Sequence, residues 1–79
     1  MKNLRSGKVV LETTVGETQY VVIRRSKGVY VVWQDNQIRD MYTATKVETK
    51  VVGGKAYLVR HVAGLQLFDL LGPISEEVK

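Results

Sequence analysis

Cysteine is absent from the 79-residue sequence, and histidine occurs once, as His61. The lack of cysteine excludes disulfide bonds and thiolate metal sites, and one histidine does not form a histidine-rich metal site. A chain of this length buries only about 60% of the surface that its unfolded form exposes. Because neither disulfides nor such metal sites can support the fold, we expect it to depend on close packing or on a partner chain.

Long apolar runs are missing as well. No apolar segment of the sequence approaches the length of about 18 residues that a membrane-spanning helix needs. The start of the chain, residues 1–8, is basic, but the apolar segment of a signal peptide does not follow it. Without cysteine there is also no sign of an oxidising compartment. From these absences we expect a cytoplasmic protein.

Side chains suited to catalysis are few and scattered. The serines, Ser6, Ser26 and Ser75, do not lie in a Gly-x-Ser-x-Gly sequence, and a nucleophilic triad also needs a base and an orienting group. The Gly-Lys pairs at residues 7–8 and 54–55 lack the upstream glycine, the Ser or Thr and the helix of a phosphate-binding loop. We therefore predict a protein without enzymatic activity, without a metal and without another cofactor.

Proline is scarce too, since it occurs only at Pro73, so nothing interrupts a β-strand before that point. The sequence is instead rich in β-branched residues, with fourteen valines, six threonines and three isoleucines. Such side chains pack well on a pleated sheet. We therefore predict a mainly β protein, folded as one domain over residues 1–79.

Alternation of apolar with polar residues marks the strands. It predicts them at residues 8–15, 19–25, 29–34, 43–52 and 55–62, separated by turn-forming residues at 16–18, 26–28, 35–37 and 53–54. Residues 38–42 have a weak pattern and fit either a short strand or a loop. The prediction is an antiparallel meander of about five strands, which either closes into a small barrel or stays open as a curled sheet.

The turn at residues 26–28 decides which side chains share a face. A three-residue turn pairs Ile23 with Val31 and Val21 with Trp33, which makes one face of the two strands uniformly apolar. We predict that this face points inward. The opposite, exposed face would then carry Tyr20, Val22, Arg24, Tyr30, Val32 and Gln34.

The leucine-rich segment at residues 65–71 differs from the valine-rich strands before it. Leucine favours helices and Gly72-Pro73 is a helix stop, so we predict a short C-terminal helix, although an apolar run this short also fits a strand. The helix would cap the sheet and expose apolar side chains that a second copy covers, as in a two-fold homodimer. The predicted oligomer interface is Leu65, Leu67, Phe68 and Leu71, and a frayed tail follows at residues 75–79.

Positive charge is concentrated in the first four-fifths of the chain. The formal net charge is +4, and residues 1–63 hold eleven lysines and arginines against five acids. Basic residues lie near tyrosines in two predicted patches, and a flexible basic arm is predicted at residues 1–7. The first patch is Tyr20, Arg24, Arg25, Lys27 and Tyr30, the second is Lys46, Lys50, Tyr57 and His61, and the arm brings Lys2 and Arg5 beside Lys8.

Cations that hold phosphates and aromatic rings that stack on bases are typical of proteins that bind single-stranded nucleic acid. The first hypothesis is therefore a small DNA- or RNA-binding protein, which we expect to be a homodimer. In it, Arg24, Arg25 and Lys27 would hold phosphates, while Tyr20 and Tyr30 would stack on bases. The other interpretation of these residues is that arginine–tyrosine pairs stabilise an exposed sheet face without any ligand.

The second hypothesis is a non-enzymatic assembly module, such as a small regulatory or virus-encoded factor that docks on another protein. It depends on the apolar C-terminal helix and on the exposed positions predicted for Val22, Tyr30 and Val32. The lone His61 fits a polar surface residue better than a metal ligand, because no other ligand accompanies it.

Overall fold

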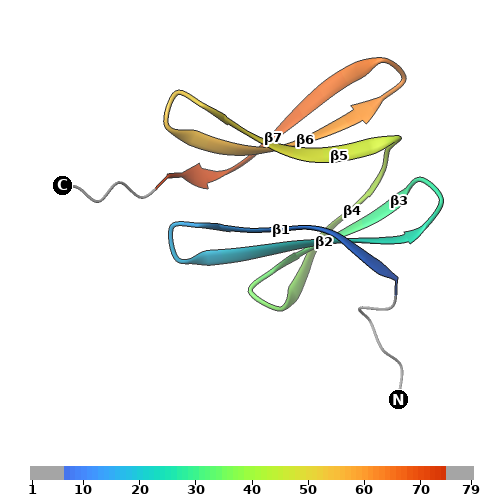
Figure 1. Cartoon of the computed structure of the whole chain (residues 1–79), viewed down its shortest axis with the longest axis horizontal. Coiled ribbons are helices and arrows are strands. Elements are labelled where there is room, and N and C mark those ends of the chain that lie inside the picture. The colour runs from blue at the N-terminus through green and yellow to red at the C-terminus, as the bar shows by residue number, and fades with distance from the viewer. Residues whose placement is uncertain (1–6, 75–79) are drawn as a thin grey trace.

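The computed structural model describes residues 7–74, which fold into seven strands joined by two-residue turns and contain no helix (Figure 1). The first four strands form one antiparallel sheet and the last three form another. Within this described part of the chain, therefore, there is no helix that could cross a membrane. The first sheet holds β1 (Lys8–Val15), β2 (Thr18–Ser26), β3 (Val29–Gln34) and β4 (Gln37–Thr43), and the second holds β5 (Lys46–Val52), β6 (Lys55–Val62) and β7 (Leu65–Pro73).

The two sheets face each other, with the three-stranded sheet above the four-stranded one in the view of Figure 1. The chain passes from one to the other through Ala44 and Thr45. Ala44 N–H donates to Gly28 O and Thr45 N–H donates to His61 O, each at 2.9 Å, so this link is hydrogen-bonded to both sheets. The core between the sheets is formed by Val15, Tyr20, Val22, Tyr30, Val32, Ala44, Ala56, Leu58 and Leu71.

The prediction of a mainly β protein with antiparallel strands is confirmed, but the predicted number of strands and their arrangement are wrong. Residues 8–15, 29–34 and 55–62 form strands with the predicted bounds, and the uncertain segment 38–42 belongs to a full strand. Neither the small barrel nor the single curled sheet of about five strands forms, because the link at 44–45 starts a second sheet. Of the predicted arm at residues 1–7, all but Gly7 lies outside the described residues, as does the predicted tail at 75–79.

The predicted C-terminal helix is wrong, because residues 65–71 belong to strand β7. Ala63 and Gly64 form a tight turn with φ values of 52° and 81°, which sets Leu65 directly opposite Val62. Such left-handed two-residue turns match the twist of an antiparallel pair. The backbone of β7 can therefore hydrogen-bond to β6, and this tertiary pairing outweighs the weak helix preference of leucine.

The face prediction for β2 and β3 is reversed, although the register is correct. Val21 lies opposite Trp33 and Ile23 opposite Val31, as predicted, but the turn holds two residues and a bulge falls between Arg24 and Ser26. The predicted exposed face points at the second sheet instead. Four of its six side chains are at most 7% exposed, namely Tyr20, Val22, Tyr30 and Val32. Arg24, near the turn, is exposed and Gln34 is part-buried.

A second, smaller cluster covers the opposite face of the four-stranded sheet. Val21, Ile23, Val31 and Trp33 pack together there, and none is more than 7% exposed. Central strands that are apolar on both faces are typical of sheets buried on both sides. The described chain thus has apolar side chains on two faces of the same sheet.

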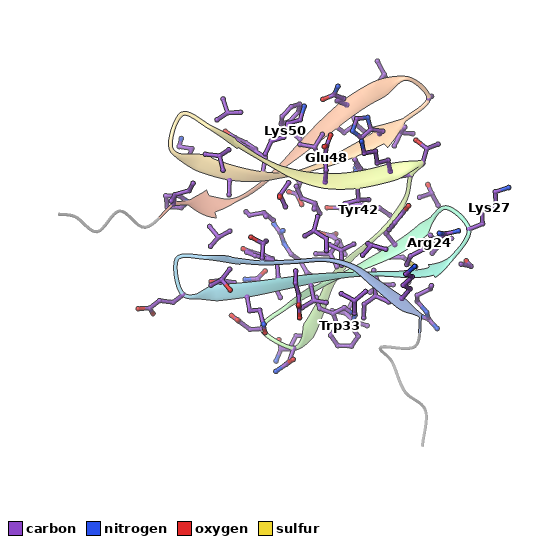
Figure 2. All side chains as sticks on the ribbon, in the orientation of Figure 1. Arg24, Lys27, Trp33, Tyr42, Glu48 and Lys50 are labelled. Atoms are coloured by element: carbon purple, nitrogen blue, oxygen red, sulfur yellow. The ribbon has the colours of Figure 1, made fainter. Side chains whose placement is uncertain are left out.

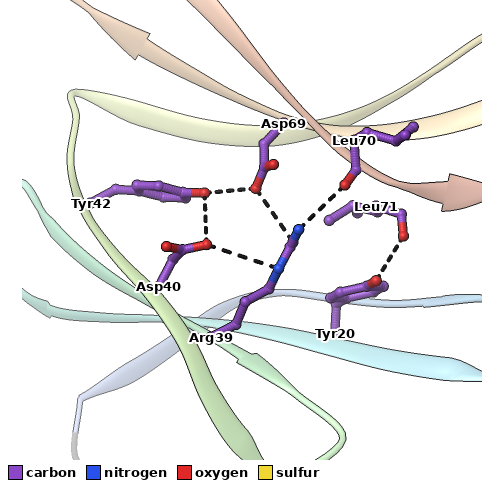
Figure 3. Close-up of polar contacts among 7 residues, drawn as sticks. All are labelled: Tyr20, Arg39, Asp40, Tyr42, Asp69, Leu70 and Leu71. Atoms are coloured by element: carbon purple, nitrogen blue, oxygen red, sulfur yellow. Dashed lines mark hydrogen bonds and ion pairs between the residues drawn. The ribbon is translucent and has the colours of Figure 1, made fainter.

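An inter-sheet polar cluster of Arg39, Asp40, Tyr42 and Asp69 joins β4 to β7 (Figure 3). The Tyr42 hydroxyl donates to Asp69 Oδ2 at 2.7 Å, and the Arg39 guanidinium lies 3.3 Å from the same oxygen. Arg39 also donates to the carbonyl oxygen of Leu70 at 3.4 Å. Hydrogen bonds to charged groups contribute more than neutral ones, so this cluster helps to hold the sheets in register.

Tyr42 makes the stability of the fold sensitive to alkaline pH. Burial raises the pKa of the Tyr42 phenol, and the hydrogen bond to Asp69 and the charges of Asp69 and Asp40 raise it further, against a lowering by Arg39. A raised pKa stabilises the folded state below the unfolded tyrosine value of about 10, and this stabilisation is lost as pH rises above it. We therefore expect the free energy of unfolding to fall above about pH 10, and to fall less in Tyr42→Phe.

The measurement is urea unfolding of both proteins at a series of pH values from neutral to strongly alkaline, followed by circular dichroism. Lysines titrate in the same range, so the comparison with Tyr42→Phe is what isolates the phenol. Equal losses of stability in the two proteins would contradict the role given to Tyr42.

Candidate nucleic-acid interface

The outer side of the three-stranded sheet collects the second predicted patch on one face. Lys46 lies opposite His61 and Lys50 opposite Tyr57 in the β5–β6 pair, as the alternation of the two strands predicts. Figure 2 shows Glu48 and Lys50 on the side of this sheet that faces away from the other sheet. We call this surface the basic face; it comprises Lys46, Glu48, Lys50, Lys55, Tyr57, His61, Gln66 and Phe68.

An aromatic pair lies in the middle of the basic face. The rings of Tyr57 and Phe68 meet edge to face, with centroids 5.7 Å apart and planes at 79°. Phe68 is 50% exposed, while Val59 beside it is fully buried. The Lys50 ammonium lies 5.9 Å from the centre of the Phe68 ring and donates to Gln66 Oε1 at 3.0 Å. The face therefore offers a solvent-accessible ring with a cation next to it.

Glu48 is the one acidic residue among the described side chains of the basic face. Its Oε2 lies 2.7 Å from His61 Nε2. This hydrogen bond lowers the pKa of the Glu48 carboxyl against the opposing effect of desolvation, and the charges of Lys46 and Lys50 lower it further. Glu48 thus stays ionised at neutral pH and offsets one positive charge, so the face keeps a positive balance.

The first predicted patch is divided between the surface and the core. Arg24, Arg25 and Lys27 are exposed at the β2–β3 turn, whereas Tyr20 and Tyr30 are only 4% and 7% exposed. The Tyr20 hydroxyl donates to Leu71 O at 2.7 Å across the two sheets (Figure 3). A buried ring with a paired hydroxyl, as in Tyr20, is typical of a core tyrosine, and neither ring is exposed enough to stack on a base.

The three cations that remain at this turn, Arg24, Arg25 and Lys27, form what we call the basic end. A hollow of about 350 Å³ lies beside it, lined partly by Arg24, Lys27 and Thr45. Thr45 immediately precedes the first residue of β5. Figure 2 shows Arg24 and Lys27 at the end of the molecule where β5 begins, so the basic end adjoins the Lys46 end of the basic face.

The predicted oligomer interface is not one surface in the structure. Leu65 and Leu67 are 63% and 38% exposed, but Leu71 is 9% exposed and belongs to the core between the sheets. Phe68 lies on the opposite side of β7, on the basic face. Sequence reasoning assigned Phe68 to an oligomer interface and not to the nucleic-acid site, because a strand, unlike the predicted helix, places alternate residues on opposite faces.

The sequence matches no protein-family model, and neither a curated protein nor a solved structure shows significant similarity to it. The chemistry of the basic face and the basic end is therefore what points to a function.

Proposed function

We propose that the protein is a non-enzymatic nucleic-acid-binding protein that holds single strands on its basic face. The observation that carries the proposal is the half-exposed Phe68 ring, which lies against Tyr57 and beside Lys50. Single-stranded nucleic acids bind to surfaces that combine aromatic rings, on which bases stack, with cations along the backbone. Phe68 and Tyr57 supply the rings, and the lysines of the face supply the charge.

The backbone of the bound strand would follow the lysines. Lys46 and Lys55 lie at opposite ends of the β5–β6 pair, with Lys50 between them on the same face. The basic end extends this path beyond β5, and its arginines can each make two hydrogen bonds to a phosphate. A strand that stacks on Phe68 would thus have cations on both sides of the stacked base.

The test is fluorescence anisotropy of a labelled single-stranded oligonucleotide at several salt concentrations. We expect Phe68→Leu to weaken binding about tenfold or more while leaving the salt dependence unchanged, because it removes a stacking ring and no charge. We expect Lys46→Gln to lower the slope of log affinity against log salt by about 0.7, the value for one phosphate contact in a single strand.

Met41→Leu is the control, since Met41 is 59% exposed and lies on the four-stranded sheet, away from the basic face. The double variant Arg24→Ala, Arg25→Ala tests the basic end. It should weaken the binding of long oligonucleotides more than the binding of short ones. If neither Phe68→Leu nor Lys46→Gln changes binding, or if wild type binds no oligonucleotide at low salt, the proposal is wrong.

The alternative is an assembly module that docks on another protein. The exposed valines on which the sequence analysis based it are not exposed in the structure. Val22 and Val32 are buried between the sheets, so they offer no docking surface. The outer face of the four-stranded sheet is apolar instead, and a cross-strand row runs across all of its strands. The row is Val9–Ile23–Val31–Met41, and Val9 and Met41 at its ends are 52% and 59% exposed.

Ile23 and Val31, in the middle of the row, are each 1% exposed, so the docking surface of this alternative consists of the exposed ends, and exposed apolar surface can mark an interaction site. This alternative predicts that the purified protein shifts no oligonucleotide at moderate salt and has the ultraviolet absorbance of protein alone. It also predicts a single protein partner whose binding is lost in Met41→Lys and retained in Lys46→Gln, measured by affinity capture with both variants in parallel.

A further inference from the structure

Four strands form the edges of the two sheets within the described residues: β1, β4, β5 and β7. An exposed edge presents unpaired backbone groups, and native proteins usually blunt it with a bulge, a proline or a charge. β1 has a register shift between Val9 and Leu11. The register of β4 against β3 shifts between Val32 and Trp33. The register of β7 against β6 also shifts, and β7 ends at Pro73.

β5 differs from these edges in having neither a bulge nor a proline, and its protection is limited to the charges of Lys46, Glu48 and Lys50. It pairs with β6 from Lys46–His61 to Val52–Lys55 without a register shift. Thr49, the middle residue of the strand, is exposed, and Val51 is 62% exposed. A regular, accessible edge of this kind is a template for pairing with another strand.

The sequence of β5 complements itself when it is paired antiparallel with a second copy about Thr49. Thr49 then lies opposite its own copy, Glu48 lies opposite Lys50, and Val47 lies opposite Val51. Residues directly opposite each other in an antiparallel pair share a face and interact. The outer face would gain two oppositely charged pairs, and the inner face would gain two valine pairs.

Pairing about Val47 also sets Lys46 opposite Glu48, but it engages only residues 46–48 of the strand, and two further centres bring like charges together. Pairing about Glu48 sets Glu48 against its own copy and Lys46 against Lys50, while pairing about Lys50 sets two Lys50 side chains together. Like charges that face each other destabilise a sheet. Thr49 is also the central position of Lys46–Val52, so pairing about it uses the whole strand.

We propose that two copies of the protein form a two-fold dimer in which their β5 strands pair antiparallel about Thr49. The two three-stranded sheets then become one sheet of six strands, and the two basic faces lie on the same side of it. The two-fold axis runs perpendicular to the sheet, because that is the symmetry that preserves faces in an antiparallel pair. The dimer does not depend on nucleic-acid binding.

Charge reversal tests the register directly, with mass measured by size-exclusion chromatography and light scattering. Wild type is expected to be a dimer. Glu48→Lys and Lys50→Glu each set like charges opposite one another twice in the dimer, so we expect each to weaken dimerisation about tenfold or more. Carrying both substitutions in one chain restores opposite charges, and we expect the dimer to return.

Mixing the two single variants gives the sharpest result. Glu48→Lys in one chain and Lys50→Glu in the other place opposite charges at every facing position, so the mixture should form heterodimers although each variant alone does not. Glu17→Lys and Lys27→Glu, at exposed turns of the four-stranded sheet, are matched controls for the change of charge. A monomeric wild type, or a dimer unaffected by the single reversals, overturns the proposal.

A cysteine at the symmetry centre provides an independent measurement. The chain has no cysteine of its own, so Thr49→Cys introduces one thiol, and pairing about Thr49 brings it next to its copy. Opposite residues in an antiparallel pair lie within the Cα distance that a disulfide spans. We expect Thr49→Cys to form a disulfide-linked dimer under mild oxidation and the exposed control Thr14→Cys to stay largely unlinked. Equal cross-linking of the two variants would overturn the register.

Discussion

Leu58→Ala is expected to lower the free energy of unfolding by about 3 kcal/mol, the middle of the range for removing a buried leucine side chain. Leu58 is 1% exposed and lies on β6, the central strand of the three-stranded sheet. It packs in the core between the sheets with Tyr20, Val22 and Val32. Truncation leaves a cavity that two sheets of fixed spacing cannot easily close.

The measurement is thermal and urea unfolding followed by circular dichroism. In a domain of this size, 1 kcal/mol corresponds to about 4–8 °C in Tm, so the loss should exceed about 12 °C. Leu67→Ala is the matched control, because Leu67 lies on the neighbouring strand and is 38% exposed. Similar losses in both variants would show that Leu58 is not packed between two sheets.

The parts of the fold that can be predicted from sequence are those decided by local residues. Alternation locates β1 and β3 with the bounds observed. The Gly53-Gly54 pair correctly marks the turn between β5 and β6. The register of β2 against β3 also follows from sequence, because a three-residue turn keeps Val21 and Ile23 opposite apolar partners, whereas a simple two-residue turn sets Val21 opposite Gln34. Turn chemistry and side-chain period act over a few residues, so they are visible in one sequence.

Which face points inward depends on partners that lie far away in the chain. Residues 20–23 and 30–33 are apolar on both faces, so their alternation does not show which side meets the second sheet. The short link at Ala44 and Thr45 has no strong turn residue, so the start of a second sheet gives no local signal. In residues 65–71, the preference of leucine for helices is also outweighed by the pairing of this segment with β6, which is a tertiary interaction.

The candidate site, like the fold, could be predicted where it depends on neighbouring strands and not where it depends on distant ones. Lys46, Lys50, Tyr57 and His61 alternate on two strands that a strong turn joins, so the sequence places them together. Phe68 joins them only once β7 is known to be a strand. The inter-sheet polar cluster was missed, since Asp69 is 27 residues from Tyr42 and the segment that carries Tyr42 has a weak pattern.

Asp69→Ala is the second substitution with a large expected effect, about 2 kcal/mol of unfolding free energy. The Asp69 carboxylate accepts the hydrogen bond from the Tyr42 hydroxyl and pairs with the Arg39 guanidinium. Removing the Asp69 carboxylate leaves the part-buried phenol of Tyr42 and the part-buried guanidinium of Arg39 without this acceptor. Leaving such groups unpaired costs more than removing them together with the carboxylate. The side chain of Asp69 is 30% exposed, so solvent keeps the loss below that of a fully buried pair.

A double-mutant cycle with Tyr42→Phe shows whether the loss comes from this contact. In the Tyr42→Phe protein there is no hydroxyl to leave unpaired, so Asp69→Ala should cost about 1 kcal/mol less than it does in wild type. Glu17→Ala, at the exposed β1–β2 turn, is the control for removing an acid, and it should be nearly neutral. Additive losses would mean that Asp69 acts through Arg39 alone, whereas coupling would show that one carboxylate holds β4 to β7 through both side chains.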